Sequence, residues 1–175
     1  MMNYQKITKC DTANGIGVRV VLWVSGCDHH CKGCHNPQTW DVNSGQPFTQ
    51  KSLDELIEAL NKPWIAGLTL SGGDPFHPNN VAKLAYITNL VKLKFPEKTI
   101  WCYTGYSLCD LLKAEEENMA VAVLMSRIDI LVDGEYKEEL RDVSFPWAGS
   151  SNQKVWAKDM SGNWVLSQYN VRKKV

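Results

Sequence analysis

The chain has 175 residues, 44% hydrophobic and 22% charged, and is long enough to bury a core as one globular domain. Basic and acidic residues number 19 each, which argues against nucleic acid or an anionic membrane as the main partner. The longest apolar runs are too short to span a bilayer and the start lacks the apolar stretch of a secretory signal, so we expect a cytoplasmic protein.

Strand patterns alternate with helix patterns along most of the chain. Near-continuous apolar runs predict buried strands, and apolar residues at helical spacing after a capping residue predict helices; the first helix is expected to start with a capping box at Ser52–Glu55. The predicted strands lie at 19–25, 68–71, 99–104 and 128–132, and the predicted helices begin near Ser52, Asn79 and Ser107.

The end of the chain follows a different pattern. Residues 154–166 alternate around Ser161-Gly162-Asn163, which predicts a β-hairpin. The sequence therefore predicts an α/β fold with mainly parallel strands, either open or curled into a partial (β/α) barrel, and a C-terminal hairpin tail. We expect one domain over 1–153, with 154–175 as an extension of it rather than a second domain.

The unusual motifs all follow predicted strands. Residues 27–36 (the cysteine loop) follow the first, SGGDP at 71–75 (the glycine turn) the second, Thr104-Gly105-Tyr106 the third and Asp133-Gly134 the fourth. Ligands in parallel α/β proteins bind at the carboxyl ends of the strands. The order of motifs therefore predicts one shared site.

Cys27, Cys31 and Cys34 form the cluster C-x3-C-x2-C. In a reducing compartment, clustered cysteines are more often metal ligands or catalytic groups than disulfides. A structural zinc ion needs four ligands, so it would add a histidine from the cysteine loop: His29, His30 or His35. A [4Fe–4S] cluster on three thiolates would leave one iron open to a substrate. We expect His29 and His30 to face solvent, and Cys10, Cys102 and Cys109 to be packing residues or idle thiols.

The cysteine spacing resembles that of the radical S-adenosylmethionine enzymes. The closer resemblance is to the activating enzymes of anaerobic ribonucleoside-triphosphate reductases, and it extends from about Tyr4 to Gln153. The stretches that carry it are NGIGVR (14–19), the cysteine loop through Trp40, NSGQPFT (43–49), LSGGDP (70–75), WCYTGY (101–106), LVDG (131–134) and GSSNQ (149–153). The resemblance implies the partial barrel of radical S-adenosylmethionine enzymes.

The resemblance also implies the chemistry. Cys27, Cys31 and Cys34 would each bind one iron of a [4Fe–4S] cluster, and S-adenosylmethionine would chelate the fourth. Reductive cleavage of S-adenosylmethionine would give a 5′-deoxyadenosyl radical, which takes a hydrogen atom from a glycine of the large reductase subunit. The electron donor would be reduced flavodoxin or ferredoxin, and the chain could form a homodimer or a hetero-tetramer with the reductase.

The resemblance implies binding residues for S-adenosylmethionine in two segments. Gly33, Cys34 and His35 would lie beside the ligand, with the His35 ring near the adenine. Gly72 and Gly73 would let the ligand approach the backbone closely, and Asp74 could accept a hydrogen bond from its ammonium group. A plain strand-to-helix turn is the alternative for the glycine turn.

Ala148 departs from the family pattern, which usually has arginine before the glycine of GSSNQ, and puts the role of residues 148–154 in doubt. Two alternative functions remain open. One is the activation of a pyruvate formate-lyase-type enzyme, or other radical chemistry on a small molecule. The other is a zinc or iron–sulfur module without turnover, which explains the cysteines but not the other strand-end motifs.

Overall fold

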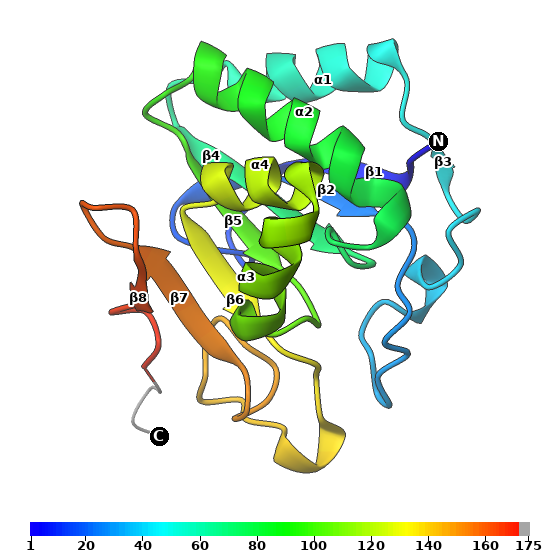
Figure 1. The fold of residues 1–175 in the computed structure, drawn as a ribbon. Helices are drawn as coiled ribbons and strands as arrows, with labels where there is room; N and C mark the ends of the chain where they lie inside the picture. The colour runs from blue at the N-terminus through cyan, green and yellow to red at the C-terminus, as the bar shows by residue number, and fades with distance from the viewer. Residues whose placement is uncertain (172–175) are drawn as a thin grey trace.

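A computed structural model describes residues 1–171 of the chain (Figure 1). The strands are β1 (Asn3–Asp11), β2 (Val18–Val24), β3 (Gln46–Pro47), β4 (Ile65–Gly72), β5 (Thr99–Tyr103), β6 (Ile130–Asp133), β7 (Lys154–Lys158) and β8 (Trp164–Leu166). The helices are α1 (Gln50–Leu60), α2 (Pro78–Lys94), α3 (Leu108–Glu117) and α4 (Met119–Arg127), with 3-10 turns η1 (Pro37–Thr39) and η2 (Glu138–Leu140). The basic residues at 172–174 lie outside the described part.

The strands form one eight-stranded sheet in the order β3-β1-β2-β4-β5-β6-β7-β8. The centre, β2-β4-β5-β6, is parallel, as the alternation of strands and helices predicted. Both edges are antiparallel, because β1 returns directly onto β2 and β7 returns onto β6. The fold is therefore mixed α/β, and the expectation of mainly parallel strands is correct only for the centre.

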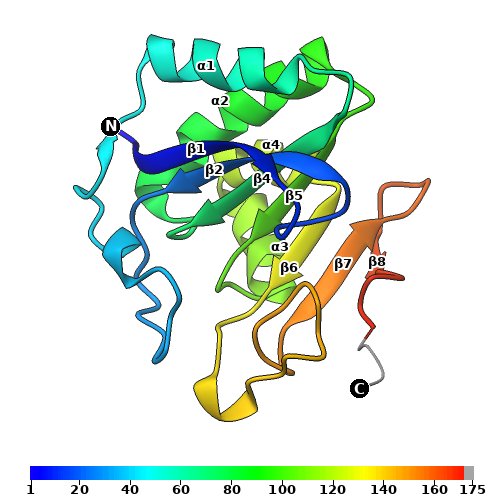
Figure 2. The same cartoon turned by 180° about the vertical axis from the view of Figure 1, so that it is seen from behind.

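The helices lie on one side of the sheet, and the view from behind shows the strands uncovered by helices (Figures 1 and 2). Apolar side chains of the central strands pack against α2 and α4 in one core that includes Leu22, Leu70, Leu84, Ile100 and Leu124. On the other side, Trp101, Val132, Phe145 and Val155 form a smaller cluster beneath the loop after η2. No helix within residues 1–171 is long and apolar enough to cross a membrane.

Helix α1 begins earlier than the sequence predicted. Its N-cap is Thr49, and Ser52 is the third helical residue, whose hydroxyl accepts a hydrogen bond from the Thr49 N–H at 3.2 Å. The capping box predicted at Ser52–Glu55 was therefore placed one turn too late. The predicted start of α3 is confirmed, because Ser107 is its N-cap and the Ser107 hydroxyl accepts a hydrogen bond from the Asp110 N–H.

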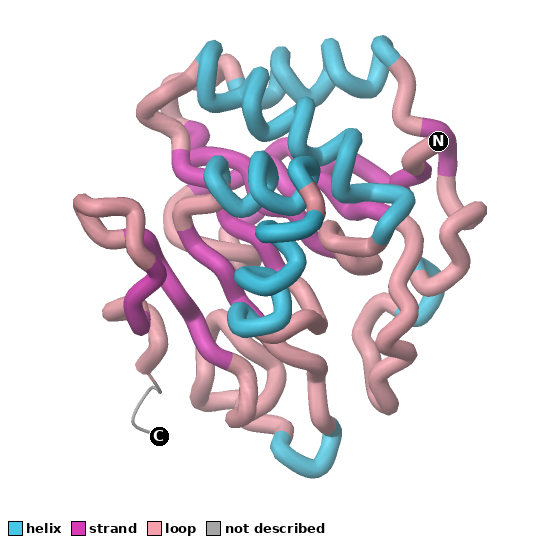
Figure 3. The backbone as a smooth tube through the Cα atoms, in the orientation of Figure 1, coloured by secondary structure: helices cyan, strands magenta, loops and turns pink. Residues whose placement is uncertain are grey.

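The hairpin predicted at 154–166 is confirmed as β7 and β8. Gly162 stands in its turn at a φ of 84°, a conformation that glycine adopts without strain. Strand β7 pairs with β6, so the hairpin continues the main sheet (Figure 3). This pairing adds the two predicted hairpin strands to the main sheet.

Candidate functional site

The four strand-end motifs meet at one edge of the sheet. The N–H of Gly73 donates to the carbonyl of Val24 at 2.8 Å, which joins the glycine turn to the end of β2. The N–H of Gly134 donates to the carbonyl of Tyr106 at 3.1 Å, which joins the ends of β5 and β6. In Figure 2 the segments after β2 and β6 leave their strands toward the same side of the molecule. The prediction of a shared edge is confirmed.

Backbone hydrogen bonds hold the cysteine loop in place. The N–H of Cys27 donates to the carbonyl of Trp40 at 3.1 Å, and the N–H of Cys34 donates to the carbonyl of Cys31 at 3.1 Å. Gly33 has a φ of 75°, so the chain turns between the second and third cysteines in a conformation that side chains disfavour. The N–H of Asn36 points to the Cys34 sulfur at 3.4 Å. The loop thus presents three half-buried thiols.

Burial favours the protonated form of Cys27 and Cys31 in the metal-free chain. It raises the pKa of Cys27 to about 11, and the charge of Asp74 makes a smaller contribution in the same direction. It also raises the pKa of Cys31, to which the charge of Glu135 adds. Thiolates are the form that binds metal, so these two side chains would release protons when a metal centre forms.

A single metal ion and an iron–sulfur cluster require different arrangements of their ligands. Within residues 1–171, no group of three or more Cys, His, Asp or Glu side chains is placed to hold one metal ion. A single zinc ion binds each thiolate at about 2.3 Å, which requires its ligands to converge on one point. An iron–sulfur cluster binds each thiolate through a different iron, so its ligands stand further apart. A loop that carries three cysteines within eight residues can supply thiolates for such a cluster.

A cavity of about 350 Å³ opens beside Cys31 and Cys34. Its wall is shared by the cysteine loop, β5 and the segments after β6, and includes His35, Tyr103, Tyr136, Trp147 and Gln153. His35 is exposed, with its ring centre 6.0 Å from that of Tyr136. The cavity therefore combines thiols with aromatic rings, as a site for a flat organic ligand would.

Residues 148–153 form part of this cavity wall. The Gln153 side-chain oxygen accepts from the N–H of Gly149 at 2.9 Å and of Ser150 at 3.1 Å, and its nitrogen donates to the carbonyl of Gly134 at 2.8 Å. Ala148 lines the cavity without a polar side chain. The segment whose role the sequence left in doubt thus has a defined place beside the cysteines.

The glycines of the glycine turn are required by the backbone itself. A Cβ on Gly72 would come within 2.7 Å of the Val24 carbonyl oxygen, and one on Gly73 would collide with the Gly26 carbonyl. The sequence explained these glycines by the approach of a ligand. In the structure they let the turn pack directly on the entry to the cysteine loop.

Asp74 is 2% exposed and accepts several hydrogen bonds. Its carboxylate accepts from the N–H of Phe76 and of Gly105, each at 2.8 Å, and from the Thr104 hydroxyl at 2.9 and 3.0 Å. The acid predicted to meet a ligand's ammonium group is therefore already bonded to two strand ends.

His29 is the residue of this site that sequence reasoning missed. Instead of facing solvent, its side chain is 12% exposed, with Nε2 3.0 Å from the Asp74 carboxylate and Nδ1 2.9 Å from that of Glu135. The Asp74 contact lies at ion-pair distance, but its angle is poor for a hydrogen bond. The two carboxylates, Asp74 above all, raise the pKa of His29 to about 9 against the opposing effect of burial. His30 is exposed, as expected.

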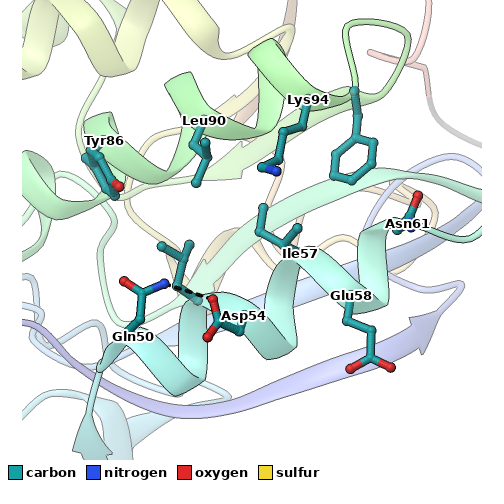
Figure 4. Close-up of a pocket in the computed structure, with 10 residues that line it drawn as sticks. Gln50, Asp54, Ile57, Glu58, Asn61, Tyr86, Leu90 and Lys94 are labelled. Atoms are coloured by element: carbon teal, nitrogen blue, oxygen red, sulfur yellow. Dashed lines mark hydrogen bonds between the residues drawn. The ribbon is translucent and has the colours of Figure 1, made fainter.

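A second hollow lies away from these motifs. A groove of about 640 Å³ runs between α1 and α2, where Ile57 faces Leu90 and Lys94, and Gln50 donates to Asp54 at 2.8 Å (Figure 4). None of the strand-end motifs lines it. The clustered cysteines, Asp74 and His29 lie instead at the carboxyl ends of the parallel strands.

Comparison with known proteins agrees with this geometry. Residues 13–156 match the profile of a family described as a 4Fe-4S single cluster domain. The chain is 42% identical to the anaerobic ribonucleoside-triphosphate reductase-activating protein of Enterobacteria phage T4 over 163 residues, 93% of this chain and 98% of the relative. It is 45% identical to the protein of the same name from Escherichia coli strain K12 over 156 residues, 88% of this chain and 97% of the relative.

Proposed function

The chain belongs to the family of anaerobic ribonucleoside-triphosphate reductase-activating proteins, whose domain holds a single [4Fe–4S] cluster, and we propose that it activates an anaerobic (class III) reductase by radical S-adenosylmethionine chemistry. The observation that carries the proposal is the set of three half-buried cysteines at the strand ends, of which Cys31 and Cys34 line the 350 Å³ cavity. When bound and reduced, the cluster would supply the one electron that cleaves S-adenosylmethionine to methionine and a 5′-deoxyadenosyl radical, and this radical would take a hydrogen atom from a glycine of the reductase.

Cys27, Cys31 and Cys34 would hold the cluster, each thiolate binding one iron. Three protein ligands leave the fourth iron for the amino and carboxylate groups of S-adenosylmethionine. The half-burial of the thiols and the N–H of Asn36 at the Cys34 sulfur favour a shielded cluster, and hydrogen bonds to sulfur are one means of setting its potential.

S-adenosylmethionine would occupy the cavity and the adjoining turn. We place its adenosine part beside Gly33, Cys34 and His35, because His35 and Tyr136 offer two rings at the cavity wall. We place its methionine part along the backbone of Gly72 and Gly73, next to Asp74, because this turn adjoins the entry to the cysteine loop. A side chain larger than glycine at position 33 would point toward Glu138 and Tyr136 and narrow the same space.

The remaining parts of the proposal concern the setting of the reaction. The central parallel strands would form the partial barrel of the radical S-adenosylmethionine enzymes, as one domain over 1–153 with 154–175 as its extension. The protein would work in the cytoplasm, receive its electron from reduced flavodoxin or ferredoxin, and bind the large reductase subunit as a homodimer or in a hetero-tetramer.

The test is anaerobic turnover with a matched cysteine control. We expect the protein supplied with iron, sulfide and a strong reductant to convert S-adenosylmethionine to 5′-deoxyadenosine and methionine, and to give a glycyl radical on the reductase. Cys31→Ala removes a ligand, so product should fall to background. Cys109→Ala removes an exposed thiol outside the cysteine loop and should behave as the parent does.

Two outcomes would contradict the proposal. One is Cys31→Ala protein that keeps a full iron complement and its turnover. The other is a parent protein that holds four irons but neither binds nor cleaves S-adenosylmethionine, which would favour a module without turnover.

A further inference from the structure

Two His–Asp contacts join the cysteine loop to the segment after β4. From the loop, His29 reaches Asp74 with 3.0 Å between Nε2 and the carboxylate oxygen. In the opposite direction, His77 Nε2 lies 3.4 Å from the carboxylate of Asp28. Two adjacent loop residues therefore contact the facing segment. In one contact the loop supplies the histidine, and in the other it supplies the aspartate.

The His29 ring lies in a site formed by three strand ends. Asp74 follows β4, Gly105 and Tyr106 follow β5, and Glu135 follows β6. The ring packs so closely on Gly105 that any Cβ there would collide with it, and it meets the Tyr106 ring edge-on at 4.7 Å between centres. A side chain held at both ring nitrogens and packed against Gly105 and Tyr106 has little freedom to move.

The Asp74 carboxylate is enclosed from two sides in this arrangement. The N–H groups of Phe76 and Gly105 and the Thr104 hydroxyl occupy it from the side of the sheet, and His29 covers it from the side of the loop. Since Asp74 is only 2% exposed, a ligand's ammonium group cannot reach its carboxylate while His29 is in place, so Asp74 acts through the loop that it holds.

We propose that His29 is a positioning residue, which fixes the cysteine loop across the ends of β4, β5 and β6 through Asp74 and Glu135. The Asp28–His77 contact is a second, weaker clamp on the same loop, because Asp28 is exposed. This inference rests on the proposed function, since its purpose is to hold the three thiolates at a set distance from the S-adenosylmethionine site. Groups that orient metal ligands in this way commonly change binding or activity 10–100-fold when removed.

The experiment compares His29→Ala with His30→Ala in the reconstituted full-length protein. His30 is the exposed neighbour on the same loop, so its variant controls for loop composition. We expect both variants to keep their iron, but His29→Ala to bind S-adenosylmethionine at least about tenfold more weakly. The change that S-adenosylmethionine causes in the electron paramagnetic resonance spectrum of the reduced cluster should weaken in His29→Ala alone.

Milder variants separate positioning from a general loss of structure. Glu135→Gln removes one carboxylate from a half-exposed residue and should weaken binding less than His29→Ala. Combining it with His29→Ala should cost nothing further, because both changes remove the same contact. His29→Gln retains a side-chain donor toward Asp74 and should restore part of the affinity.

Three results would overturn the inference while leaving the function intact. They are wild-type affinity and spectrum in His29→Ala, tighter binding in His29→Ala, and fully additive losses in the double variant. Tighter binding would mean that the His29 ring blocks an ammonium site on Asp74. Failure of the function itself has a different signature, because the parent protein would then show no S-adenosylmethionine binding.

Discussion

Two buried charges stand at opposite ends of the same parallel strands, and their surroundings differ. Arg19, at the start of β2, is fully buried, and its N–H groups donate only to uncharged oxygens: Thr69 and Thr99 hydroxyls and the carbonyls of Ile16, Leu68 and Thr99, at 2.7–3.2 Å. Burial lowers its pKa only to about 10, so it stays charged at neutral pH. Asp74, after β4, is bonded to strand ends and to a loop histidine.

The partners of a buried charge distinguish a structural role from a place in a functional site. The partners of Arg19 come from strands of the core and from the turn before β2, so this arginine joins β2, β4 and β5 at their amino ends. The partners of Asp74 come from segments that carry the unusual motifs, and one of them is on the cysteine loop. Burial of charge is common to both ends, whereas only the carboxyl end also gathers the groups that a ligand needs.

The first prediction concerns Arg19, at the amino ends of the parallel strands. Arg19→Met should lower the free energy of unfolding by about 4 kcal/mol, because the buried hydroxyls and carbonyls around it lose their donors. Arg19→Lys should lose less stability than Arg19→Met, because lysine keeps the charge and can still donate some of these hydrogen bonds. Urea denaturation of the metal-free protein measures both. A loss below about 1 kcal/mol for Arg19→Met would mean that water reaches these groups and that the two ends are not as different as they look.

The second prediction compares one glycine from each end. A Cβ on Gly67 would collide with the backbone carbonyl of Thr99 on the neighbouring strand, so Gly67→Ala must separate β4 from β5 and should cost about 3 kcal/mol. The three atoms nearest to a Cβ on Gly105 all belong to the His29 ring, a side chain that can be displaced at the cost of its contacts with the two carboxylates. Gly105→Ala should therefore cost about 1 kcal/mol in unfolding but weaken S-adenosylmethionine binding.

Thermal or urea unfolding and S-adenosylmethionine titration of the same two variants provide the check. The comparison between the ends fails if Gly105→Ala destabilises the protein as much as Gly67→Ala. It also fails if Gly67→Ala protein, under conditions where it is folded, loses the ligand while Gly105→Ala keeps it.

The sequence predicted the central strands and the cysteine cluster because both are local signals. Strand β2 is apolar apart from Arg19, whereas β1 was missed because lysine, glutamine and threonine interrupt a half-exposed strand near the edge of the sheet. Helix α4 was not among the predicted helices. Its start at Asn118, whose side chain accepts from the N–H groups of Ala120 and Val121, was the overlooked signal.

The partners of Asp74 could not be predicted in the same way. They depend on how segments after β2, β4, β5 and β6 meet in space, which no local pattern encodes. The solvent-facing expectation for His29 was wrong for this reason, since nothing beside it in the sequence shows the two carboxylates that it contacts. A histidine between two clustered cysteines, with an acid in the next strand-end motif, is the combination that deserved a test.

The last and smallest prediction compares one threonine from each end. Thr69 accepts from Arg19 at 2.7 Å and donates to the carbonyl of Asn14 at 2.8 Å, whereas Thr104 donates to Asp74 at 2.9 Å. Replacing either with valine keeps the shape and removes one buried hydroxyl, so each should cost about 1–2 kcal/mol in unfolding. Only Thr104→Val should also weaken S-adenosylmethionine binding, because it loosens the carboxylate that holds His29. Paired urea and ligand titrations of the two variants test this, and equal ligand affinities would show that the Asp74 network, like that of Arg19, serves the fold alone.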